Sequence, residues 1–290
     1  MKLYLLNRSS RENSSFTLST QSYPHFLKIW HNHPELELVL ILKSTGTRFI
    51  GDSIEKFKEG EIVLLGKGLP HMWLNDERYY KGDEKMKAEA IAVHFREDFL
   101  GAEFFNTTEM KNIGELLNLS CRGIVFRNVH NEIIEKIKQL QKNEGFKKTL
   151  NFLEVLQGLS MHKDIEQLSS VGFANSFEKP GNKSLAKVYE FIFENFKEPI
   201  SAKDAAKISN ISVSSFSRYF KRIHRKTFTS YLNEIRIGYA CKLLLENKES
   251  ISEICFESGF SNISNFNRQF RKIKGLAPRG FIQKHTNKLP

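Results

Sequence analysis

The chain has 290 residues, of which 40% are hydrophobic and 27% are charged. This length suits two ordinary domains, and the composition is that of a folded globular protein. No apolar run approaches the roughly 20 residues of a membrane span, and the N-terminus lacks the apolar core of a signal peptide. The cysteines Cys121, Cys241 and Cys255 follow no metal or disulfide pattern, which predicts a cytoplasmic protein, and the lack of an apolar span predicts no membrane association.

The positive charge is concentrated in the C-terminal part of the chain. Residues 184–290 contain 19 Lys and Arg against 9 Asp and Glu, a net charge of +10, whereas residues 1–183 contain 25 against 24, a net charge of +1. A basic part beside a nearly neutral part indicates two different tasks, and the basic part is the one expected to meet a polyanion such as DNA.

Residues from about 16 to 99 have the pattern of short strands. Apolar residues alternate or run in short bursts, as in residues 36–42, 62–65 and 90–95, and glycine-containing turn signals separate them. Regular short strands predict a sandwich or barrel. The expected fold class is therefore α+β, with an N-terminal cupin-like β-barrel and accessory helices at 1–165 and an all-α domain at 184–290.

Two helical patterns follow the strands, at 131–142 and 148–162, each with one apolar stripe. We expect them to cover the end of the barrel, and apolar surface left exposed on them would serve a homodimer interface. Residues 166–183 are rich in Ser, Gly, Asn and Pro and are predicted to form the linker between the domains.

The C-terminal part contains an internal repeat. Ser201 and Asp204, and again Ser250 and Glu253, have the spacing of a capping box at a helix start. The two boxes lie 49 residues apart, and each is followed by a turn and a second helical pattern. Two units of helix, turn and helix in tandem are therefore predicted.

The turn of each unit has its own residues. Asn210 and Gly259 suit a left-handed turn position, and Ser212 and Ser261 are expected to cap the second helices. Arg225 ends the second helix of the first unit, where glycine is the usual residue.

Each second helix has one buried face and one polar face. From here the offset between the units is 50: Phe216 and Phe220 in one unit correspond to Phe266 and Phe270 in the other. The i, i+4 spacing places each pair on one stripe, with Arg and short polar residues opposite. Such a helix is suited to entering a major groove, and residues 229–246 are predicted to form a long helix between the units.

Residues 201–281 resemble the DNA-binding domain of the AraC/XylS family of bacterial regulators. The resemblance is carried by Ser212-Val-Ser-Ser-Phe-Ser-Arg-Tyr-Phe-Lys221 and by Phe266-Asn-Arg-Gln-Phe-Arg-Lys272 with Gly275-Leu-Ala-Pro278. Carried over by position, it implies that bases are read by Ser214, Ser217, Arg218, Ser264, Asn267 and Arg268. Phosphate contacts are implied for Lys221, Arg222, Arg271 and Lys272. The chain is accordingly expected to bind double-stranded DNA as a transcriptional regulator, not to act as an enzyme.

A histidine-rich pattern stands in the N-terminal part. Alternation in His31-Asn-His33-Pro-Glu-Leu-Glu37 places His31, His33 and Glu37 on one strand face. This segment and Gly60…Gly66-Lys-Gly-Leu-Pro-His71-Met-Trp-Leu-Asn75 resemble the two motifs of cupin barrels, although Gly66 replaces the usual proline. The resemblance implies that His31, His33, Glu37 and His71 converge, and in metal-binding cupins such a set holds one cation.

Three interpretations of this pattern remain open. The favoured one is a pocket for a small-molecule effector, a sugar or another polar metabolite, because sensor domains of AraC-like regulators resemble cupins and bind such effectors. The pocket would be lined by His31, His33, Glu37, Arg48, His71 and Trp73, with Trp stacking and Arg gripping an anionic group. The histidines alternatively serve the barrel's internal hydrogen bonding, or hold a metal ion, with a metal-dependent cupin enzyme as the extreme case. No cofactor is expected.

Overall fold

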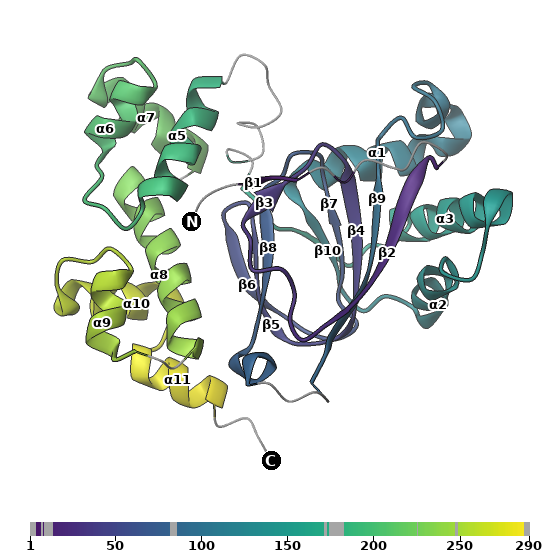
Figure 1. Cartoon of the computed structure of the whole chain (residues 1–290). Helices are drawn as coiled ribbons and strands as arrows, with labels where there is room; N and C mark the ends of the chain where they lie inside the picture. Colours follow the sequence, from purple (N-terminus) through teal and green to yellow (C-terminus); the bar gives the residue numbers. More distant parts are fainter. Residues whose placement is uncertain are drawn as a thin grey trace. The chain divides into compact units, whose positions relative to one another are not determined.

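The computed structural model describes residues 4–6, 8, 14–81, 86–170, 173, 183–224, 226–246 and 249–286. The chain divides into two compact units, one formed by residues 4–75 and 79–174 and the other mainly by residues 175–290. The first contains the strands and three helices and the second is built from helices, which confirms the predicted α+β two-domain architecture (Figure 1).

The strand-rich unit contains two sheets. The first has the strand order β1-β3-β8-β5-β6, formed by Tyr4–Leu5, His31–Asn32, His71–Asn75, Gly46–Ile50 and Ser53–Phe57. The second has the order β11-β10-β7-β4-β9-β2, formed by Ile165–Gln167, Ile124–Phe126, Ile62–Leu65, Leu36–Lys43, Ala88–Phe95 and Phe16–Tyr23. Among the described residues the two sheets are not joined by strand pairing, so the barrel is cupin-like in its strands without being closed.

Alternation along β4 determines what each face of the six-stranded sheet contacts. Leu36, Leu38 and Leu40 belong to the main hydrophobic core, whereas Glu37 and Val39 face the opposite side and line a pocket. Because successive side chains of a strand point to opposite faces, this strand separates an apolar core from a functional cavity.

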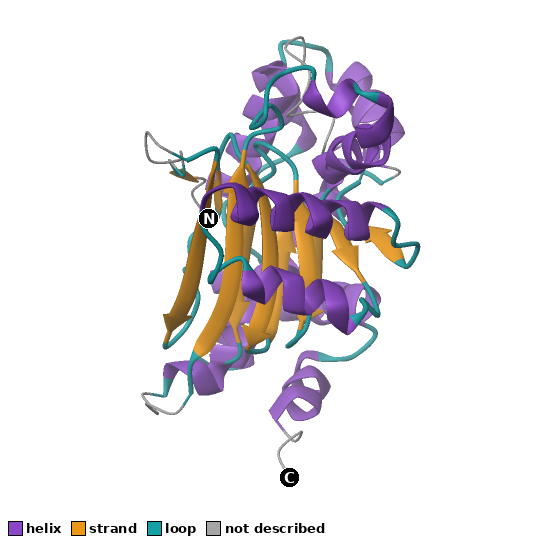
Figure 2. Ribbon diagram, turned by 90° about the vertical axis from the view of Figure 1, so that its right-hand side faces the viewer, coloured by secondary structure: helices purple, strands orange, loops and turns teal. Residues whose placement is uncertain are grey.

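Helices cover the outer face of the six-stranded sheet. They are α1 (Lys111–Leu119), α2 (Asn131–Gln139) and α3 (Gly145–Ser160). Short 3-10 turns are formed by Glu77–Tyr80, Phe104–Asn106, Thr108–Met110 and Ser120–Arg122. Phe152 and Leu156 of α3 are fully buried in the same core as the leucines of β4. Figure 2 shows helices lying across the strands. The expected position at the end of the barrel was therefore wrong: the outward-facing leucines of the sheet need an apolar cover along the whole face.

The barrel unit continues past residue 165, where the linker was expected to begin. Strand β11 pairs antiparallel with β10, and the segment after it is tied to the hairpin between β5 and β6. The Asp52 carboxylate accepts hydrogen bonds from the Ser169 hydroxyl (3.0 Å) and the Ser170 N–H (2.8 Å), and Phe173 is fully buried. The rest of the predicted linker, residues 171–172 and 174–182, lies outside the described residues.

The second unit consists of helices. They are α5 (Lys183–Asn195), α6 (Ala202–Ile208), α7 (Val213–His224), α8 (Phe228–Glu246), α9 (Ile251–Glu257), α10 (Ile263–Lys274) and α11 (Pro278–Thr286). Helices α6 and α7 form the first predicted helix-turn-helix unit, α9 and α10 form the second helix-turn-helix unit, and α8 is the long connector between them. Near its start the connector α8 buries Tyr231 and Leu232. Further along it buries Ile237, Ala240 and Leu244 in the core of the second helix-turn-helix unit. No described helix is long and apolar enough to cross a membrane.

Local signals fix the ends of these helices. The backbone N–H groups of Ser201 and Ser250 donate to Asp204 (2.9 Å) and Glu253 (2.7 Å), so both capping boxes form. Helix α10 is capped by Asn262, whose side chain accepts the N–H of Asn265 at 2.8 Å. The expectation that Ser261 is this cap was wrong. The second turn is one residue longer than the first, so the position that corresponds to Ser212 is Asn262.

The turns themselves follow the predicted chemistry. Asn210 has φ of 56° and Gly259 has φ of 85°, so both occupy the left-handed region that favours asparagine and glycine. Ser212 caps α7, since its hydroxyl accepts the N–H of Ser215 at 3.2 Å. Arg225 lies outside the described residues.

Candidate DNA interface and barrel pocket

Helices α7 and α10 present the same pattern of exposure, position by position, over residues 213–222 and 263–272. All ten residues implied to contact DNA are exposed: Ser214, Ser217, Arg218, Lys221, Arg222, Ser264, Asn267, Arg268, Arg271 and Lys272. The structure therefore brings the predicted base-reading and phosphate-contacting side chains onto the free faces of two helices.

The opposite face of each helix is anchored in a small aromatic core. Phe216 and Phe220 are fully buried with ring centroids 5.4 Å apart, and Phe266 and Phe270 are fully buried with centroids 5.7 Å apart. Buried aromatic pairs of this kind hold a helix in a fixed orientation, so the polar face of each helix points in a direction set by its own unit.

The two polar faces differ in how their arginines are held. The Arg268 guanidinium donates to the Asn265 side-chain oxygen at 2.9 Å. In α7 the position three residues before Arg218, which corresponds to Asn265, is Ser215. Its shorter side chain contacts the hydroxyl of Ser212 at 2.9 Å. Helix α10 therefore presents Arg268 in an orientation that a neighbouring side chain of the same helix already holds.

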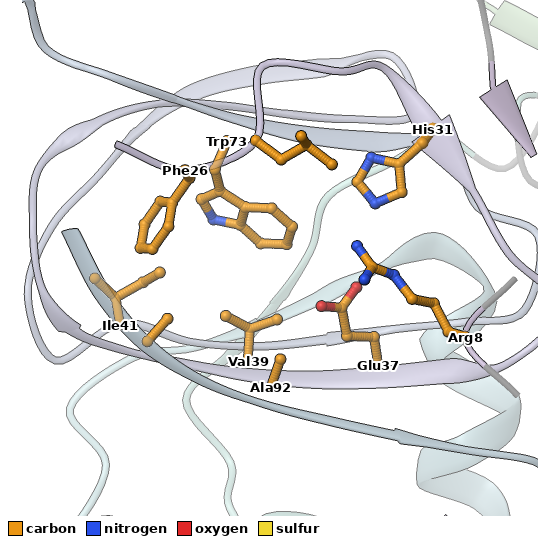
Figure 3. Close-up of a pocket in the computed structure, with 10 residues that line it drawn as sticks. Arg8, Phe26, His31, Glu37, Val39, Ile41, Trp73 and Ala92 are labelled. Atoms are coloured by element: carbon orange, nitrogen blue, oxygen red, sulfur yellow. The ribbon is translucent and has the colours of Figure 1, made fainter. Parts of the chain in front are cut away.

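A separate cavity lies inside the barrel unit, between side chains of both sheets (Figure 3). Its volume is about 40 Å³, which holds two or three water molecules at about 10–15 Å³ each. Phe26, Trp73 and Ile41 lie at one end, and His31, Glu37 and Arg8 lie at the other. One end of the cavity is therefore apolar and the other is polar.

The polar end is the edge of a buried group of histidines around one carboxylate. We name it the His/Glu cluster; it consists of His31, His33, Glu37, His71 and His94. The Glu37 carboxylate lies 3.2 Å from Nε2 of His33, 3.0 Å from Nε2 of His71 and 3.4 Å from Nε2 of His94. All five side chains are buried.

Ionisation in the His/Glu cluster is strongly shifted. Burial, together with the neighbouring His71, lowers the pKa of His31 to about 3, so this ring is neutral at physiological pH. Burial raises the pKa of Glu37, but His94, His33 and His71 outweigh it and hold the pKa well below its usual range. The cluster therefore presents an ionised carboxylate among imidazoles.

The structure brings some of the residues predicted for the pocket together and places Arg48 elsewhere. His31, His33, Glu37 and His71 do converge, and Trp73 lines the cavity. Arg48 does not serve it: this fully buried side chain is paired with Glu61 and Glu55, each at 2.9 Å. An arginine with two carboxylates in reach is committed to them.

Two residues of the site were missed by sequence reasoning. His94 stands among apolar residues near the end of β9, opposite Glu37 in the pairing of β9 with β4. Arg8 lies between β1 and β2 and points into the polar end of the cavity (Figure 3). The lone polar residue in the apolar run of residues 90–95 was the available signal for His94.

Comparison with known proteins agrees with the geometry of the helical unit. Residues 205–284 match the family profile described as "Helix-turn-helix domain". The chain is 21% identical over 257 residues to the uncharacterized HTH-type transcriptional regulator YdeC of Bacillus subtilis, covering 87% of this chain and 84% of YdeC. It is 22% identical over 286 residues to the HTH-type transcriptional activator RhaR of Mannheimia succiniciproducens, covering 96% and 95%.

A similar solved structure is that of ToxT from Vibrio cholerae strain SCE256 with a bound unsaturated fatty acid. It covers 97% of this chain and 100% of that chain, with 14% identity and a TM-score of 0.40.

The two tandem units, the family profile and the full-length relatives define a helix-turn-helix DNA-binding protein. Residues 205–284 form a helix-turn-helix domain of the AraC type, and over most of its length the chain is similar to HTH-type transcriptional regulators.

Proposed function

We propose that this regulator reads a specific DNA site by placing α7 and α10 in successive major-groove segments. The observation that carries the proposal is the matched exposure of the two helices above matched buried phenylalanine pairs. Recognition helices of tandem units on one face of a duplex are spaced by about one helical turn, roughly 34 Å.

Base reading is proposed for Ser214, Ser217, Arg218, Ser264, Asn267 and Arg268, and phosphate contacts for Lys221, Arg222, Arg271 and Lys272. Arginine reaches guanine and asparagine reaches adenine in bidentate fashion, whereas serine is permissive. The second unit offers Asn267 where the first offers Ser217, and its Arg268 is already oriented by Asn265. We therefore propose that α10 discriminates bases more strongly than α7.

We further propose that a ligand in the barrel controls this activity. A small polar metabolite would place its polar groups against Arg8, His31 and Glu37 and its apolar face on Trp73. Pockets for such ligands usually measure about 300–1,000 Å³, so a sugar-sized effector has to widen the present cavity, and a widened barrel is a natural second state. The proposed output is activation of transcription in the cytoplasm, the direction that the name of RhaR carries, and no enzymatic activity is proposed.

A homodimer is proposed because α3 exposes apolar side chains. Phe146 is 82% exposed and Leu150 is 45% exposed. If this face joins two copies, Phe146→Asp converts a dimer to a monomer in light scattering, while the barrel keeps its fold.

The DNA proposal is tested with the full-length protein on duplexes enriched from a random pool. We expect a selected sequence and a steep fall in affinity with salt. Arg218→Ala and Arg268→Ala should each cost about 1–3 kcal/mol on that sequence and relax its specificity, with the larger loss for Arg268. Lys142→Ala, an exposed charge on the barrel unit, is the matched control. Failure to enrich any sequence, or equal losses for all three variants, overturns the proposal.

A further inference from the structure

We propose that Arg236 is a positioning residue that holds the helices α7 and α10 at one fixed separation, and that it thereby sets the number of base pairs between the two DNA segments that they read. This role rests on the proposed function, in which both helices read DNA, and adds what fixes their spacing. It depends on the connection between α5 and α6 (residues 196–200), which lies against both α8 and the second helix-turn-helix unit.

Arg236 of α8 grips this connection with a fork of two hydrogen bonds. Its Nε donates to the carbonyl oxygen of Phe196 at 2.7 Å, and its Nη2 donates to the carbonyl oxygen of Glu198 at 2.7 Å. A guanidinium is planar and its donors have a fixed geometry, so two bonds from one group set both the position and the direction of the connection. The connection leads directly into Ser201, the cap of α6, and α6 packs against α7. The fork therefore orients the first helix-turn-helix unit.

The same connection is held by the second helix-turn-helix unit. The Lys197 ammonium is paired with the Glu257 carboxylate at the end of α9 and lies 4.5 Å from the centre of the Tyr239 ring. The Tyr239 hydroxyl donates to the same carboxylate at 3.2 Å. The turn after α9 approaches so closely that a Cβ on Gly259 would lie 2.7 Å from the carbonyl oxygen of Phe196. The connection is thus attached to α8 and to the second unit at once.

Arg236 lies where these two attachments meet. Its guanidinium carbon is 5.7 Å from the centre of the ring of Phe260, a buried residue in the turn of the second unit. Phe196 is fully buried, with its ring centroid 5.2 Å from that of Tyr239. Burial lowers the pKa of Arg236, which shows that the guanidinium has given up hydration in this position. We therefore assign this arginine to the junction between the units and not to the phosphates of DNA.

Two attachments restrict the two units more than one does. Helix α8 runs between them (Figure 1), and long helices curve along their length, so a change in its curvature alone would move α7 relative to α10. A second attachment beside the helix opposes that movement. One additional base pair between the two DNA segments shifts the second segment by about 3.4 Å and turns it by about 34°. A rigid pair of helices cannot follow such a change.

The first test measures the separation of the helices without DNA. Spin labels are attached to cysteines placed at Ser217 and Asn267, the matched exposed positions of α7 and α10. The background is Cys121→Ser, since the other two cysteines of the chain are buried. Double electron–electron resonance on the full-length protein should give one narrow distribution of distances.

Variants connect the width of this distribution to Arg236. Arg236→Ala removes both hydrogen bonds and should broaden it, and Arg236→Lys, which offers a point charge in place of a fork, should broaden it less. Glu234→Gln is the matched control, because it breaks the pair with Lys226 (2.6 Å) on the same helix without touching the connection. Circular dichroism shows whether each variant is folded. If Arg236→Ala does not fold, Lys197→Ala loosens the same connection from its exposed side and takes its place.

The second test measures binding to the selected duplex and to the same duplex with one base pair inserted between the two segments. The wild-type protein should bind the longer duplex at least about 10-fold more weakly, the size of one good base contact. For Arg236→Ala this ratio should fall to about 3-fold, because α10 can then follow its bases. For Glu234→Gln the ratio should stay at the wild-type value.

The role of Arg236 is refuted if Arg236→Ala leaves the distance distribution as narrow as in the wild-type protein, or if its spacing ratio equals the wild-type ratio. Failure to select any DNA sequence would instead refute the proposed reading of DNA. The distance measurement, which uses no DNA, would then decide alone whether Arg236 holds the two helices.

Discussion

The turn between α9 and α10 predicts a large effect for a single methyl group. Gly259 has φ of +85°, and a Cβ there would lie 2.7 Å from the carbonyl oxygen of Phe196 and 2.8 Å from Cα of Lys197. The left-handed conformation alone costs a non-glycine residue about 1–2 kcal/mol. Forcing backbone apart at a packed contact adds about 1–3 kcal/mol. We expect Gly259→Ala to lower the free energy of unfolding by about 2–5 kcal/mol.

Gly275 provides the matched control. It ends α10 with φ of +72°, and nothing lies within 4 Å of the position of an added Cβ. Gly275→Ala therefore isolates the conformational cost of about 1–2 kcal/mol. Urea unfolding of the full-length variants, followed by the circular dichroism of the helical unit, measures both changes. Equal losses for the two variants would refute the reasoning, because they would show that the turn of the second unit does not abut the connection between α5 and α6.

Three further results are expected. Asn262→Ala should destabilise the helical unit by about 1 kcal/mol in urea unfolding and Ser261→Ala by much less; equal effects would show that Asn262 is not the cap. Arg48→Ala should cost about 3–5 kcal/mol, because it leaves the buried carboxylate of Glu61 without its main partner; unchanged stability would instead return Arg48 to the pocket. His31 has a pKa of about 3 in the fold against 6.5 otherwise, so the unfolded chain binds more protons between these values. The free energy of unfolding should therefore fall as the pH is lowered from 6.5 to 3, by up to about 1.4 kcal/mol per pH unit, and a flat profile below pH 6.5 would contradict the shift.

The helical unit was predictable because its signals are local. A capping serine, an acid three residues later and phenylalanines at i and i+4 define each unit within about one helix length, and the repeat of these signals confirms the assignment. The one misplaced cap, Ser261 for Asn262, follows from the same locality: an inserted residue shifts the cap without altering the apolar stripe that was used to align the two units.

The boundary of the barrel unit was less predictable, since it depends on contacts across more than a hundred residues. Ser169 and Ser170 have the composition of a linker, yet they bind the side chain of Asp52. A segment rich in small polar residues is flexible only when no distant acceptor fixes it. Composition reports the residue types and carries no information about that acceptor.

The polar site shows how strand register decides what a motif can do. His94 faces Glu37 because β9 pairs with β4 in a register that sets these two residues opposite each other, and opposite residues of an antiparallel pair share a face. A slip of one residue would turn His94 to the helix-covered side. Arg48 stands opposite Trp73 by the same rule, yet its guanidinium goes to Glu61 and Glu55. Register brings a side chain to a face of the sheet, and competition among charged partners then determines which groups remain available for a ligand.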